Sequence, residues 1–73
     1  MNRRRIQNLA EQYQERAYAN AQAHDGDTHT ADCDAWLRRI LAEDGVLPEF
    51  IETEFERVMA EVLREAPRTS ATT

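Results

Sequence analysis

Three runs of apolar residues, spaced three or four positions apart, are the feature of this sequence that most limits its fold. They cover about residues 2–22, 31–43 and 48–66. This spacing places apolar side chains on one face of an α-helix, and no segment alternates as a strand would. Breaks that contain Gly26 and Gly45 separate the runs. The sequence therefore predicts an all-α fold, most simply a small three-helix bundle.

The residues at the ends of the runs predict where each helix starts and stops. Thr30 stands where an N-cap belongs, and Gly45 suits the position just after a helix. Pro48 is favoured at the first position of a helix, whereas Pro67 should end one. We expect residues 67–73 to form a disordered tail, because their composition is small and polar.

The chain is short and has one cysteine. Its 73 residues predict one helical domain, residues 1–66, that begins with a basic arm, residues 1–5. Cys33 has no second cysteine to pair with, so no disulfide supplements the small core. An unpaired cysteine and the lack of an apolar leader or membrane-spanning run lead us to expect a soluble, cytoplasmic protein without membrane contact.

A polar stretch between the first two runs raises the question of a metal site. His24, His29 and Cys33 lie within eleven positions, residues 24–34, together with four aspartates. Zinc prefers such ligands, but the spacing matches no paired zinc motif and no calcium loop. A turn at Gly26 and a helix start at Thr30 explain the same residues. We therefore predict no cofactor, and keep a small metal-binding domain as an alternative.

The same stretch offers little for catalysis. Cys33 with His24 or His29 is the one nucleophile–base pair that the sequence suggests. A helix N-terminus would lower the pKa of the thiol, but the neighbouring aspartates oppose this effect. We therefore predict that the protein is not an enzyme.

Basic charge is concentrated at the start of the chain. All nine basic residues are arginines, and the net charge is −5. Residues 25–73 hold twelve acidic residues against five arginines, which argues against broad nucleic-acid binding. Arg3, Arg4 and Arg5 oppose the dipole of the helix that they begin. They predict an arm that contacts an acidic protein surface or nucleic-acid phosphate.

The third run has an apolar stripe wider than a small bundle needs. It includes Phe50 and Phe55, and Trp36 of the second run is a further aromatic candidate for partner binding. Such a surface favours either a homodimer or a larger partner. The many glutamates at the start of the third run argue against insertion of this helix into DNA.

In size, acidic helical body and short basic arm, the chain resembles small phage-encoded host-takeover proteins. The resemblance is one of kind and transfers no residue roles. It implies a non-enzymatic interaction protein that binds and inhibits or redirects a larger host complex, with RNA polymerase favoured. The resemblance also implies two alternative targets, a CRISPR effector and a signalling factor. The alternatives are an anti-CRISPR-like acidic mimic and a homodimeric antitoxin-like or structural helical module.

Overall fold

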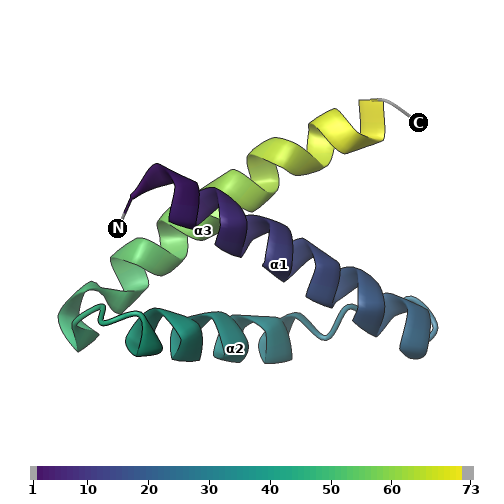
Figure 1. The fold of residues 1–73 in the computed structure, drawn as a ribbon. Coiled ribbons are helices and arrows are strands. Elements are labelled where there is room, and N and C mark those ends of the chain that lie inside the picture. The colour runs from purple at the N-terminus through teal and green to yellow at the C-terminus, as the bar shows by residue number, and fades with distance from the viewer. Residues whose placement is uncertain (1, 72–73) are drawn as a thin grey trace.

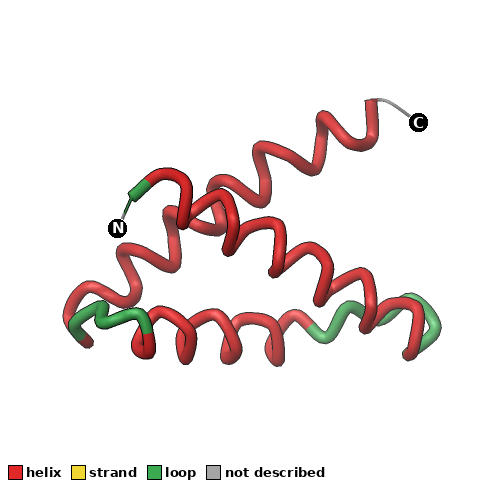
Figure 2. The backbone as a smooth tube through the Cα atoms, viewed as in Figure 1, coloured by secondary structure: helices red, strands yellow, loops and turns green. Residues whose placement is uncertain are grey.

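Three helices make up the fold. The computed structural model describes the backbone of residues 2–71 and the side chains of residues 2–64. The helices are α1 (Arg3–Ala23), α2 (Thr30–Glu43) and α3 (Pro48–Ala71). Short loops connect them (Figure 2), and the described backbone contains no strand. The predicted all-α, three-helix fold is therefore confirmed.

The helices are arranged as a flat triangle. α1 crosses α3, and α2 closes the third side (Figure 1). Each helix packs against the other two. The extents of the molecule are 37 × 25 × 14 Å. Two packed helices have axes about 8–10 Å apart and Cα radii of about 2.3 Å, so the thinnest dimension is two helices deep. A structure this thin covers few side chains completely.

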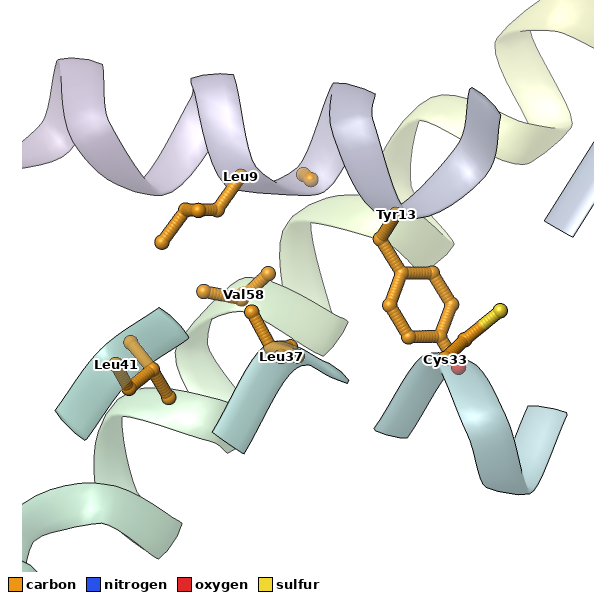
Figure 3. Close-up of a cluster of buried hydrophobic side chains, with 7 residues drawn as sticks. Leu9, Tyr13, Cys33, Leu37, Leu41 and Val58 are labelled. Carbon is orange, nitrogen blue, oxygen red and sulfur yellow. The ribbon is translucent and has the colours of Figure 1, made fainter. Parts of the chain in front are cut away.

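The core is correspondingly small. Its fully buried apolar side chains among the described residues are Leu9, Ala10 and Tyr13 of α1, Cys33, Leu37 and Leu41 of α2, and Val58 of α3. Figure 3 shows the α1 side chains directed toward those of α2 and α3. Burial of one large aliphatic side chain contributes about 1.5–3 kcal/mol, so a core of this size supports a modest stability.

Both ends of α1 are closed by local hydrogen bonds. Asn2 is the N-cap, and its Oδ1 accepts a hydrogen bond from the backbone N–H of Arg5 at 2.8 Å. The predicted helix started at residue 2, one position early, because this capping role was missed. At the other end, Gly26 N–H donates to Ala21 O at 2.8 Å. Asp25 and Gly26 have φ values of +58° and +94°, so the predicted turn is present.

The prediction that Thr30 caps α2 was wrong. His29 is the N-cap residue, with φ 50° and ψ 55°, and Thr30 is the first residue of the helix. The cause is Asp27, whose Oδ1 accepts a hydrogen bond from the N–H of His29 at 2.9 Å. This aspartate turn brings His29 into the left-handed region and leaves Thr30 with helical geometry.

The connection between α2 and α3 follows the prediction. Gly45 has φ +94° and donates its N–H to Ala42 O at 3.0 Å, while Val46 N–H donates to Leu41 O at 3.0 Å. These two bonds are those of a Schellman motif, with glycine at C′. Pro48 is the first residue of α3, as expected.

α3 continues five residues beyond its predicted end at residue 66, to Ala71. Pro67 lacks an N–H and therefore removes one hydrogen bond, but the helical backbone continues past it. The side chains of residues 65–71 and all of residues 72–73 lie outside the described part, so the disordered tail stays a prediction. Within residues 2–71, every helix is too short or too polar to cross a bilayer.

Candidate functional site

A hollow lies where α1 begins, α2 ends and α3 begins. We call it the N-terminal hollow. It has a volume of about 640 Å³, is open to solvent, and is lined by Asn2, Arg5, Asp44, Gly45, Val46, Leu47, Phe50 and Glu54. The three helix ends that form it lie at one end of the triangle (Figure 1). Its volume falls within the range of about 300–1,000 Å³ that is typical of ligand sites.

An ion pair holds one wall of this hollow. Arg5 Nε donates to Asp44 Oδ2 at 2.6 Å, and Arg5 Nη2 donates to Asp44 Oδ1 at 3.0 Å. This hydrogen-bonded contact to the carboxylate raises the pKa of Arg5. The two residues are 39 positions apart in the sequence. One of the three predicted partner-binding arginines therefore joins the start of α1 to the end of α2.

Arg3 and Arg4 have no such role. Both are exposed, and neither forms an ion pair with a residue that the structure describes. Arg4 lines a second, smaller hollow of about 220 Å³, together with Asn2, Arg5 and Asn8. Asn2 and Arg5 line both hollows, so the smaller hollow that Arg4 lines adjoins the N-terminal hollow. The predicted arm thus splits into one structural and two exposed arginines.

The hollow has exposed apolar side chains. Phe50 is 51% exposed and Leu47 is 56% exposed, and both belong to its lining. Phe50 was a predicted anchor, but Leu47 was missed. A leucine between Gly45 and Pro48 has no helical period to place it, which makes its exposure difficult to foresee. The signal that was available is that a large apolar residue occupies a short connection, where polar residues are usual.

Two other predicted anchors lie elsewhere and are partly covered. Trp36 and Phe55 both pack against the core. The Arg16 guanidinium lies over the Trp36 ring at 5.4 Å from its centroid. The Arg38 guanidinium lies over the Phe55 ring at 4.2 Å and donates two hydrogen bonds to Glu52, at 2.8 and 3.1 Å. These bonds lower the pKa of Glu52. The structure does not bring Trp36 and Phe55 into the N-terminal hollow.

The three metal candidates are only partly brought together. The rings of His24 and His29 meet edge to face, with centroids 4.3 Å apart. The buried Cys33 thiol is engaged by its own neighbours, since Sγ lies 3.7 Å from Thr28 O and 3.6 Å from Asn20 Nδ2. No three His, Cys, Asp or Glu side chains among the described residues are placed to share a metal ion. Burial also raises the pKa of the Cys33 thiol, which disfavours a nucleophilic thiolate.

The arrangement at the N-terminal hollow is suited to binding. It combines an exposed phenylalanine with an exposed leucine, and Arg4 lines the adjoining hollow. Phenylalanine and arginine are enriched at protein interfaces. Comparisons with family models, with curated proteins and with solved structures gave no match to this chain. The functional assignment therefore depends on the hollow itself.

Proposed function

We propose that this chain is a small non-enzymatic interaction protein that binds a larger intracellular protein complex and inhibits or redirects it. The observation that carries the proposal is the exposure of Leu47 and Phe50 in one open hollow, which adjoins the smaller hollow that Arg4 lines. Exposed apolar side chains that cluster at a concave site, with a cation at the edge, are characteristic of a docking surface.

The more specific proposal is a phage-type regulator of host machinery, acting in the cytoplasm on a target such as RNA polymerase. A large nucleic-acid enzyme offers both acidic and basic surfaces, and this chain has exposed arginines at one end and an acidic body. An anti-CRISPR-like mimic would use the acidic body instead, and the arginines would then contribute nothing to binding.

The test is affinity capture from host lysate, followed by binding to the purified captured complex. A tagged chain should retain one stoichiometric partner, and Phe50→Ala should weaken that binding by about tenfold, as for an interface anchor. Leu63→Ala is the matched control, because Leu63 is 66% exposed on α3 but is not part of the hollow. Equal loss with both variants, or no loss with either, would remove the hollow from the mechanism.

A homodimeric module is the second candidate. Leu63 favours it, because this exposed leucine extends the apolar stripe of α3 away from the N-terminal hollow. A dimer through α3 would bury it and would supplement the small core. Sedimentation equilibrium on the wild type and on Leu63→Ala distinguishes the two candidates. If a dimer forms through α3, the average molar mass in solution should fall from dimer toward monomer in the variant.

A further inference from the structure

The arrangement of charge around the N-terminal hollow indicates the chemistry of its partner, if the proposed function is correct. Of the three arginines at the start of α1, Arg5 is bound to Asp44 through two hydrogen bonds. Arg3 and Arg4 are exposed and form no ion pair with a described residue. Their charges also oppose the helix dipole, because they occupy the first turn of α1. No side chain within residues 2–64 forms an ion pair with these two positive charges.

The apolar part of the hollow belongs to a lining that shares Asn2 and Arg5 with the smaller hollow of Arg4. Leu47 and Phe50 are more than half exposed, while Val46 is half-buried and packs on the core. Carboxylates are also present, but those in the lining are engaged within the chain. Asp44 is bound by Arg5, and the buried Glu54 has its Oε1 3.2 Å from Arg57 Nη1. Among the described residues, the charges near the hollow that form no ion pair are therefore Arg3 and Arg4 on the α1 side and the exposed Glu49 on the α3 side.

We infer that the N-terminal hollow binds an acidic peptide segment of the partner protein that carries a bulky apolar side chain. The apolar side chain packs between Leu47 and Phe50, and carboxylates of the segment form ion pairs with Arg4 and Arg3. Arginine suits this role because its planar guanidinium can bind a carboxylate through two parallel hydrogen bonds. The exposed carboxylate of Glu49, next to Phe50, repels the acidic residues of the segment, so they face the α1 side.

Nucleic acid fits this end less well. Two exposed arginines on a chain of net charge −5 neutralise few phosphates, and affinity for a phosphate backbone grows with the number of neutralised phosphates. Phosphate also makes no use of the exposed leucine and phenylalanine. A peptide that combines carboxylates with an apolar side chain uses both the exposed arginines and the exposed leucine and phenylalanine.

The experiment titrates the full-length, ¹⁵N-labelled chain with four probes. The first is the acidic peptide DEDFEDE, and the second is DEDSEDE, which lacks the apolar side chain. The third is the charge-reversed peptide KRKFKRK, and the fourth is a dT oligonucleotide. We expect the first probe to shift the amide signals around Leu47 and Phe50 and those of Arg3 and Arg4. We expect it to bind at least about tenfold more tightly than the others, because an anchor and two ion pairs act together.

Variants of the hollow then test each contact with the same peptide. Phe50→Ala and Arg4→Ala should each weaken binding by about three- to tenfold, and Glu49→Gln should strengthen it by about twofold. Leu63→Ala and Arg39→Ala are matched controls, since both residues are exposed outside the hollow, and they should leave binding unchanged. Added salt should weaken binding in the wild type more than in Arg4→Ala.

Apart from failure of the first peptide to bind, three outcomes would overturn the inference. They are equal binding of the acidic and the basic peptide, tighter binding of the oligonucleotide, and concentration-dependent shifts at Phe50 without any peptide, which would mean that a second copy occupies the hollow. If the peptide fails but a captured partner still depends on Phe50, the inference is wrong and the proposed function stands. If no partner binds either, both fail.

Discussion

Removing one arginine at a time from the start of α1 should separate the structural arginine from the exposed ones. Arg4→Ala relieves an unfavourable contact with the helix dipole, which is typically worth about 0.3–1 kcal/mol at an exposed site. We therefore expect the free energy of unfolding to rise slightly. Arg5→Ala relieves the same dipole contact but also breaks the two hydrogen bonds to Asp44.

The difference between these two variants isolates the ion pair. Both changes replace arginine by alanine in the first turn of α1, so the effects on the dipole and on helix propensity largely cancel. The Arg5 and Asp44 side chains are 36% and 28% exposed, and solvent screening limits such a pair to about 0.2–1 kcal/mol. Because its geometry is two-pronged, we expect the upper half of that range. Arg5→Ala should thus be less stable than Arg4→Ala by about 0.5–1 kcal/mol, or about 2–8 °C in Tm.

Urea denaturation is the appropriate assay, because guanidinium is a salt and would screen the pair. The difference in the free energy of unfolding between the two variants should shrink in high salt, because salt screens an exposed ion pair. If Arg4→Ala is as destabilising as Arg5→Ala, then Arg4 is also structural. In that case its loss could not be interpreted as the loss of a partner contact.

Three further changes test the loops and the core. Tyr13→Phe removes the 2.7 Å hydrogen bond that the phenol donates to Asp34 and should cost about 1–2 kcal/mol in urea. Burial and this bond raise the pKa of Tyr13 above its usual 10.0. The phenol's contribution to stability is therefore complete below pH 10 and is lost as the pH rises further. If the stability of the wild type falls no more steeply above pH 10 than that of Tyr13→Phe, this reasoning is refuted. Asp25→Gly should raise stability by up to about 1 kcal/mol, because φ is +58° there, and a lower urea midpoint would contradict it. Excess chelator should leave Tm unchanged, and a clear fall would restore the metal-domain alternative at His24 and His29.

The helices were predictable because their signals are local. Apolar spacing, Gly45 after α2 and Pro48 at the start of α3 each act within a few residues, and the structure follows them. The prediction errors occurred where two local structures were both compatible with the sequence. Thr30 and His29 were both available at the start of α2, and a hydrogen bond to Asp27 decided between them. Similarly, the helical backbone of α3 passes Pro67, where the usual rule expects a stop.

The candidate site was less predictable because it depends on contacts between distant residues. Nothing near Arg5 in the sequence indicates that its partner is Asp44, 39 positions away. Exposure of an aromatic residue is equally hard to foresee. Phe50 and Phe55 lie five positions apart on α3, yet one is exposed in the hollow, while an arginine of α2 covers the ring of the other. Sequence alone therefore suggested the right kinds of residue but not the place where they meet.

The location of the unexplained residues is itself an argument for function. Most of the chain is consistent at every level, since its caps, core and ion pairs support the same fold. The N-terminal hollow departs from this consistency. Arg3 and Arg4 oppose the dipole of α1 without compensation in the described structure, and Leu47 and Phe50 expose apolar surface in a hollow that the start of α1 also lines. Residues that are unfavourable for folding and have no compensating interaction are expected at functional sites. Tyr18 and Leu63 also expose apolar surface elsewhere. The reason to place the binding surface at the hollow is that two exposed apolar side chains share one concavity there.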